Sequence, residues 1–117
     1  MSSVQSSNKG TLPKSEAVAL ASLLDVVEGA VVSRTLLKRK VGTITLFTFD
    51  KGQGLSEHSA PFDAYVQVLS GEVELTIGGE PVRAKAGDAV VMPAEIPHAL
   101  QAIEPLQMLL VMIRETA

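Results

Sequence analysis

The stretch that decides the fold is residues 72–87, EVELTIGGEPVRAKAG. Apolar residues at positions 73, 75 and 77 alternate with polar ones at 72, 74 and 76, and this period of two is typical of a strand with one buried face. Gly78–Gly79 then makes a two-residue hairpin turn. In the register that this turn sets, Glu74 lies opposite Arg83. Glu72 lies opposite Lys85 in the same way, and such pairs of opposite charge add about 0.2–1 kcal/mol each. The stretch therefore predicts a β-hairpin.

The same alternation continues on both sides of the hairpin. Further predicted strands are residues 31–37, 43–49, 64–69, 89–92 and 106–113. Turns or loops separate them, among them KRKVG at 38–42, DKGQG at 50–54 and Gly87–Asp88. Many short strands with frequent turn signals predict an all-β sandwich or barrel.

The N-terminal part has a different composition. Residues 1–14 are rich in Ser, with Asn, Gly and Pro, and predict a disordered tail. The next stretch, EAVALASLLDVV at 16–27, favours a short helix capped by Ser15, although a strand over part of it is an alternative. The apolar side of that helix consists of Leu20, Leu23, Leu24 and Val27.

Composition narrows the class of protein. A chain of 117 residues with 46% hydrophobic residues suits one compact domain, which we place at residues 15–117. A domain this small buries only about two-thirds of its unfolded surface, so association into a homodimer would stabilise it. The net charge of −3 argues against a nucleic-acid partner, which usually requires a basic face. The sequence contains no cysteine, which excludes disulfides, thiolate ligands and a catalytic thiol.

The expected compartment is the cytoplasm. The N-terminus MSSVQSSNKGTLPKS lacks the apolar stretch of a secretory signal. The longest apolar run, LQMLLVMI at 106–113, is too short to span a bilayer and suits a buried strand. We therefore expect neither membrane association nor secretion.

Two motifs carry a resemblance to a known family. Gly52 is followed after five residues by His58, and Gly71 closes this first motif. Gly87 is followed after five residues by Pro93, and His98 comes five positions later. Residues 52–102 thereby resemble the cupins, a family of small jelly-roll barrels. The resemblance implies that residues 15–117 form a single cupin barrel, a double-stranded β-helix with at most a short N-terminal helix.

The departures from the motifs concern the metal ligands. Cupins usually hold a metal with three histidines and one glutamate. The resemblance puts His58 and His98 at two of these positions, whereas Ala60 and Ala64 occupy the other two. The glycine of the second motif is replaced by Glu95, and its asparagine by Ala102.

The resemblance implies a binding site at one end of the barrel. Both imidazole rings are expected inside the barrel, as ligands of a divalent transition metal (Zn, Fe, Ni, Mn or Cu). A neutral histidine pair without a metal is the alternative. The expected pocket lining is Ala60, Ala64, Val66, Val68 and Met92.

A third protein ligand is not evident from the sequence. Gln53, Glu57 and Asp63 are loop candidates, and Phe62 is expected beside Asp63 at the rim. On the strand at 64–69, Tyr65 and Gln67 should point outward if Ala64 points inward. Methionines are expected to fill gaps in the core rather than to bind metal.

Three functions agree with these residues. The favoured one is a small-molecule-binding cupin with an incomplete metal site at His58 and His98. A metal-dependent cupin enzyme, of the dioxygenase or isomerase type, is the first alternative. A metal-free cupin with a structural or interaction role is the second. For each of them the expected assembly is a homodimer, formed by sheet packing or by exchange of N-terminal strands.

Overall fold

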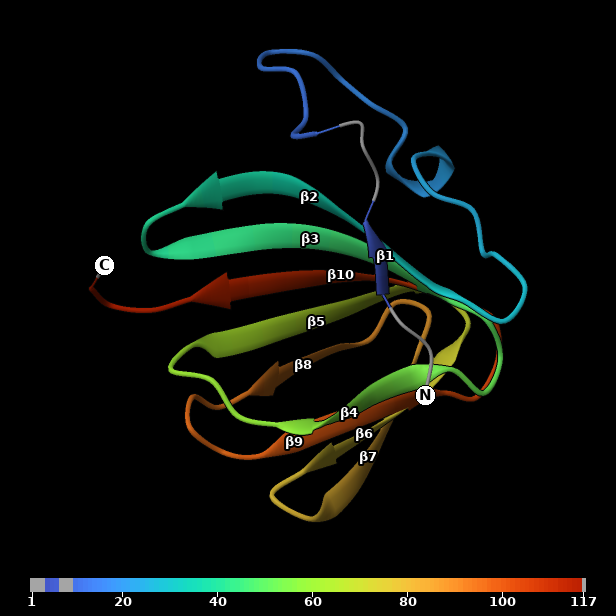
Figure 1. Cartoon of the computed structure of the whole chain (residues 1–117), viewed down its shortest axis with the longest axis vertical. Helices are drawn as coiled ribbons and strands as arrows, with labels where there is room; N and C mark the ends of the chain where they lie inside the picture. Colours follow the sequence, from blue (N-terminus) through green and yellow to red (C-terminus); the bar gives the residue numbers. More distant parts are fainter. Residues whose placement is uncertain (1–3, 7–9, 117) are drawn as a thin grey trace.

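The computed structural model describes residues 4–6 and 10–116, and these residues form an almost entirely β structure (Figure 1). The elements in chain order are β1 (Val4–Ser6), the 3-10 helix η1 (Leu20–Ser22), β2 (Val31–Arg39), β3 (Gly42–Phe49), β4 (Gly54–His58), β5 (Asp63–Ser70), β6 (Glu72–Ile77), β7 (Glu80–Lys85), β8 (Ala89–Met92), β9 (His98–Ala102) and β10 (Leu106–Ile113). The all-β class predicted from the alternation is thus confirmed.

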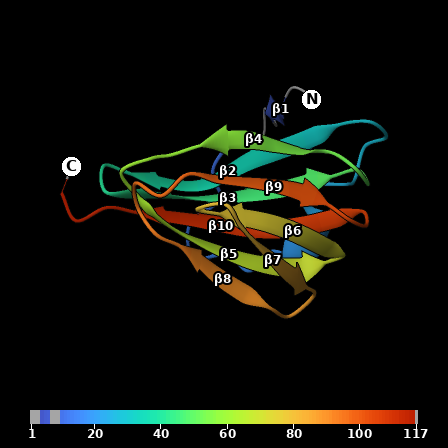
Figure 2. The same ribbon diagram turned by 90° about the horizontal axis from the view of Figure 1, so that it is seen from below.

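The strands are arranged in two sheets that lie face to face (Figure 2). One sheet has the order β1-β2-β3-β10-β5-β8, and the other has the order β4-β9-β6-β7. All pairs are antiparallel except β1 with β2. The chain crosses repeatedly between the sheets, as it does in a jelly roll. The predicted jelly-roll barrel is therefore confirmed.

The hairpin predicted at residues 72–87 has the expected bounds and register. Glu74 pairs with Arg83 and Glu72 with Lys85 across β6 and β7. The ion pairs differ from the expected ones in one respect. Arg83 forms both of them, with its guanidinium 3.0 Å from the Glu74 carboxylate and 3.3 Å from the Glu72 carboxylate. The hydrogen bonds that Arg83 donates to Glu74 and then to Glu72 raise the pKa of its guanidinium.

The core lies between the two sheets. Val66 and Val68 of β5 point inward, as predicted, and are almost completely buried. They pack in one cluster with Val73 and Leu75 of β6. Residues two apart on a strand share a face, and the rings of Phe47 and Phe49 accordingly stack with centroids 5.6 Å apart. The apolar face of each sheet thus packs against the apolar face of the other sheet.

The segment at residues 10–30 covers the outer face of the larger sheet near β2, β3 and β10. Thr48 is fully buried there, and its hydroxyl donates to the carbonyl of Asp25. Gln107, its partner on β10, donates to the carbonyls of Ala21 and Leu24. The segment thereby satisfies the buried polar groups of the sheet beneath it.

This arrangement corrects the prediction for the N-terminal part. The expected helix beginning near Ser15 is reduced to η1, and Ser15 has a positive φ of 63° instead of acting as a cap. A short isolated helix is marginally stable, whereas the carbonyls here accept hydrogen bonds from the sheet. Of the expected disordered tail at 1–14, residues 1–3 and 7–9 lie outside the described part. Within the described part, β1 pairs with β2, and the Leu12 amide donates to Leu36.

The rest of the outer face is uncovered. Tyr65, Val91 and Ile113 are 37%, 60% and 56% exposed on β5, β8 and β10. The homodimer and the cytoplasmic location stay predictions. No helix in the described ranges 4–6 and 10–116 has the length and apolar character needed to cross a bilayer.

Gly71, between β5 and β6, provides a test of the fold. Gly71 and Gly79 have the same φ of 85°, but a Cβ at Gly71 would overlap the carbonyl of Pro105, whereas nothing lies within 4 Å of one at Gly79. We expect Gly79→Ala to lower the free energy of unfolding by about 1–2 kcal/mol. Gly71→Ala should cost more, because Pro105 must also move. Urea unfolding of both variants measures the difference, and equal losses would contradict the close approach to Pro105.

Candidate functional site

The two histidines of the chain meet between the sheets. His58 is the last residue of β4, His98 is the first residue of β9, and the two are directly paired. Their ring centroids lie 4.5 Å apart with an interplanar angle of 66°. His98 is buried and His58 is exposed. The pair therefore has one ring inside the barrel and one ring that solvent can reach.

A β-bulge gives His58 its direction. Leu55 pairs with Leu100, and His58 pairs with His98. Between these pairs β4 advances three residues while β9 advances two, so β4 contains one extra residue. In a regular strand, residues three apart point to opposite faces. The extra residue turns His58 to the same side as Leu55, and both line one cavity.

Hydrogen bonds of both rings define their free nitrogen atoms. His58 Nδ1 lies 2.9 Å from the carbonyl oxygen of Ser56, and His98 Nδ1 lies 3.2 Å from that of Ile96. A carbonyl only accepts, so Nδ1 of each ring must carry the proton that it donates. In the neutral imidazole this leaves the lone pair on Nε2. Each ring thus has its Nε2 as an acceptor or metal ligand, fixed by the bond at Nδ1.

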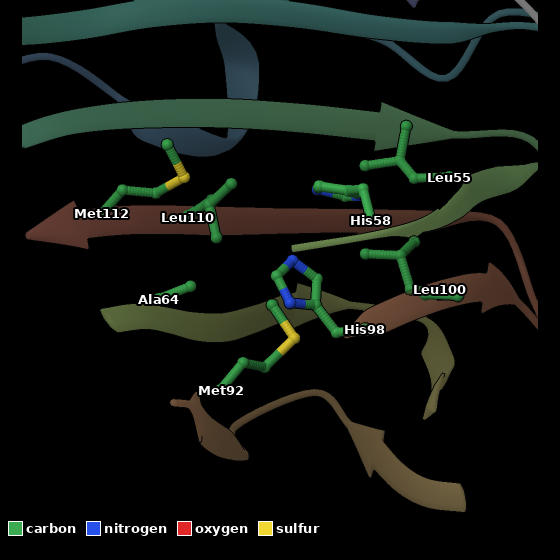
Figure 3. A pocket seen from close by; sticks show the side chains of 9 residues that line it. Leu55, His58, Ala64, Met92, His98, Leu100, Leu110 and Met112 are labelled. Carbon is green, nitrogen blue, oxygen red and sulfur yellow. The ribbon is translucent and has the colours of Figure 1, made fainter. Parts of the chain in front are cut away.

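The cavity that the histidines line is small and otherwise apolar (Figure 3). We call it the histidine cavity. It is lined by Leu55, His58, Ala64, Met92, His98, Ala99, Leu100, Leu110 and Met112. The volume that the centre of a water molecule can occupy in it is about 30 Å³. On the same measure, a single ordered water needs roughly 10–15 Å³. The space suits a metal ion or one functional group of a ligand rather than a whole organic molecule.

Only some of the residues predicted to line the pocket lie in the wall of the histidine cavity. Ala64 and Met92 line the histidine cavity. Val66 and Val68 belong to the closed core deeper in the barrel and do not line it. Ala60 also lies outside the lining, because it sits in the connection after β4. Its carbonyl there accepts the amide of Glu95 at 2.8 Å.

The loop candidates for a third ligand are directed elsewhere. The carboxylate of Asp63 accepts the Ala94 amide at 2.9 Å, which holds it to the turn before β9. Gln53 lines a separate surface hollow, and Glu57 is exposed outside the lining of the histidine cavity. Phe62 lies under the guanidinium of Arg114, at 5.0 Å from the ring centroid. These contacts leave the two imidazoles without a third oxygen or nitrogen ligand from this group.

The usual four-ligand cupin site does not fit these residues. No group of three or more His, Cys, Asp or Glu side chains within residues 4–6 and 10–116 could hold a metal ion together. A catalytic zinc site usually has three protein ligands. The donor set here consists of the two Nε2 atoms, and any further ligand must be of another kind or come from outside the chain.

The turn before His98 is strained. Glu95 has φ 69°, a left-handed conformation, and it is the third residue of the turn from Pro93 to Ile96. This position of a turn usually needs glycine when φ is positive. The amide of Glu95 ties the turn to Ala60, so the connections that carry the two histidines are joined by their backbones.

Five lining residues were not predicted from the sequence, namely Leu55, Ala99, Leu100, Leu110 and Met112. Leu110 and Met112 follow from the alternation along β10, once Met108 is known to point inward, so a signal for them exists in the sequence. Leu55 depends on the bulge in β4. No local pattern marks that bulge.

Comparison with known proteins places this site in a family. The family model described as "Cupin domain" matches residues 45–113. A conserved protein of unknown function from Streptococcus pyogenes, SPY1581, is 42% identical with a TM-score of 0.87. The match covers 92% of this chain and 95% of the Streptococcus protein. A cupin 2 conserved barrel domain protein from Leptotrichia buccalis is 38% identical with a TM-score of 0.77. The match covers 80% of this chain and 46% of the Leptotrichia protein. A cupin superfamily protein from Desulfitobacterium hafniense is 28% identical with a TM-score of 0.83. The match covers 90% of this chain and 96% of the Desulfitobacterium protein. No curated protein sequence matches the chain.

The strain at Glu95 predicts an inverted order of two variants. Glycine normally destabilises a position relative to alanine by roughly 0.5–1 kcal/mol. At Glu95 we expect Glu95→Gly to be more stable than Glu95→Ala by about 1 kcal/mol, because alanine keeps the left-handed strain. Glu80, exposed on β7 and without a positive φ, is the control, where alanine should be the more stable variant. Thermal unfolding of the four variants measures both orders, and the same order at both sites would contradict the strain.

Proposed function

This chain belongs to the cupin family, and from that premise we propose that it is a small-molecule-binding cupin whose binding site is the histidine cavity. The observation that supports this most is the pair of imidazole rings, 4.5 Å apart, each with Nδ1 bonded to a carbonyl. Two free Nε2 atoms in an otherwise apolar hollow form a small number of placed polar groups, which is the usual composition of a ligand site.

The size of the cavity limits how a ligand binds. The open space holds one functional group, such as a carboxylate or phenol oxygen, next to the buried His98. The remainder of the ligand then lies at the mouth, where His58 is exposed. We therefore expect small acids or phenols that insert their polar group between the rings.

The same pair supports binding of a transition metal ion. Imidazole nitrogen is a ligand for Zn, Cu, Fe and Ni, and the hydrogen bonds at Nδ1 fix both rings in the tautomer that a metal requires. With two protein nitrogens from His58 and His98, other coordination positions would be filled by the small molecule or by water. In this form the metal serves as the contact between protein and ligand.

The alternatives receive less support. An enzyme of the dioxygenase or isomerase type would need a carboxylate ligand or a base, and the lining of the histidine cavity contains neither Asp nor Glu. The iron sites of such oxygenases typically use two histidines and a carboxylate. A purely structural role does not require two rings held with free nitrogens at the mouth of a cavity.

Metal content tests the proposal directly. Untagged protein purified without chelators should contain a transition metal close to one ion per chain by elemental mass spectrometry. We expect the His58→Ala/His98→Ala double variant to lose that metal, because it removes both Nε2 donors. A Gln101→Ala variant, on the exposed face of β9, is the control and should keep it.

The same proteins distinguish the metal-bound from the metal-free form of the site. Metal in the wild type that persists in the double variant would contradict binding by these histidines. If the wild type contains no metal and takes up none, thermal stabilisation by small carboxylic acids and phenols tests the metal-free form. That stabilisation must also disappear in the double variant, and its absence from the wild type would overturn the proposed binding site.

A further inference from the structure

Two methionines line the same cavity as the two histidines. Met92 of β8 and Met112 of β10 both pair directly with Ala64 of β5. Directly paired residues on neighbouring strands have Cβ atoms about 4.5–5.5 Å apart, so Ala64 lies between the two methionines. Figure 3 shows both thioether side chains from the larger sheet in the cavity that receives His58 and His98.

The donor set of this cavity is therefore soft. The side-chain donor atoms among the lining residues are the two imidazole nitrogens and the two thioether sulfurs, with no carboxylate, hydroxyl or amide. Thioether ligands select Cu(I), and imidazole also suits copper. Oxygen ligands, which Mg, Ca and Mn prefer, do not occur among the lining side chains. Chemistry alone thus favours a soft ion here.

Charge leads to the same preference. The position that holds glutamate in the cupin motif is Ala64, so no anion in the lining offsets the charge of a bound ion. The solvation energy that an ion loses on entering an apolar site grows with the square of its charge. A monovalent ion therefore enters this cavity at much lower cost than a divalent one. His58 is exposed, which gives the ion a path from solvent.

From these observations we propose that the histidine cavity is a Cu(I) site in which Met92 and Met112 complete the coordination begun by His58 and His98. The proposal rests on the proposed function, because it uses the same two histidines. It goes further by adding the thioether ligands and by naming the ion. The copper binds as Cu(I), so no electron transfer is part of the binding step.

Methionine-to-leucine variants test the sulfur ligands without emptying the cavity. Leucine is close in volume to methionine, and such exchanges are among the best tolerated in a core. Met92→Leu and Met112→Leu remove one thioether each, and the double variant removes both. Met108→Leu is the matched control, because Met108 lies on β10 and is fully buried but does not line the cavity.

The measurement is the affinity for Cu(I), determined without oxygen in competition with the chromophoric chelator bicinchoninate. We expect each single variant to bind Cu(I) more weakly by about tenfold, which corresponds to ~1.4 kcal/mol, and the double variant more weakly still. Met108→Leu should bind like the wild type. Binding of Co(II), followed by its absorption spectrum, should change little in the methionine variants, because it depends on the histidines. X-ray absorption of the Cu(I)-loaded wild type should detect sulfur neighbours that the double variant lacks.

The outcomes separate this proposal from the one on which it rests. Cu(I) affinity that is unchanged in Met92→Leu and Met112→Leu, while Co(II) binding needs the histidines, would overturn the thioether site and leave the histidine site standing. Binding of neither ion by the wild type would overturn the Cu(I) site together with the metal-bound form of the proposed function. Weaker Cu(I) binding in Met108→Leu, equal to that in the other variants, would also overturn it, because a general effect on the core would then explain the loss.

Discussion

The histidine cavity depends on the β-bulge in β4, where one extra residue shifts the pairing of β4 with β9. Leu55 and His58 both face the interior only because β4 contains an extra residue between them. Without it the ring of His58 would point to solvent, and His98 would be a single buried histidine under an apolar wall. The bulge also leaves the Ser56 carbonyl within 2.9 Å of His58 Nδ1, which sets the tautomer of the ring. The direction of the His58 side chain and the tautomer of its ring thus follow from one irregularity of the backbone.

The opposite wall determines which chemistry the rings meet. β5 presents Ala64 to the cavity, and the neighbouring strands place Met92 and Met112 on either side of it. A carboxylate at the position of Ala64 would provide a negative charge and an oxygen ligand. An alanine provides neither, and it leaves the thioethers as the remaining donors in the lining. The wall is therefore neutral, and its side-chain donor atoms are thioether sulfurs.

The connections around the site are held by backbone contacts. The Glu95 amide donates to Ala60, and the Ala94 amide donates to the Asp63 carboxylate. Together they join the end of the first motif to the turn of the second. The left-handed Glu95 is the strained point of this arrangement, where the cupin motif has glycine. Strain of this kind persists only where the surrounding structure fixes the conformation, and here two hydrogen bonds from adjacent residues fix it.

Local sequence determined the parts of this protein that depend on alternation and turns. The hairpin at 72–85 has the predicted bounds and register, because Gly78–Gly79 and the period of two leave one arrangement that buries Val73 and Leu75. The resemblance to cupins that Gly52, His58, Pro93 and His98 carry likewise implied the barrel and the meeting of the two rings.

Only the tertiary structure decided which side chains meet around the histidine cavity. The bulge in β4 depends on how that strand fits β9, and no residue pattern within β4 reveals it. Met92 and Met112 are twenty residues apart in sequence, and they share a cavity because β8 and β10 both pair with β5. The stretch at 16–27 favoured a short helix by its Ser15 cap and apolar side, but its carbonyls accept hydrogen bonds from Thr48 and Gln107 of the sheet. Strand pairing and buried polar groups act over long sequence separations, and for that reason local patterns do not contain them.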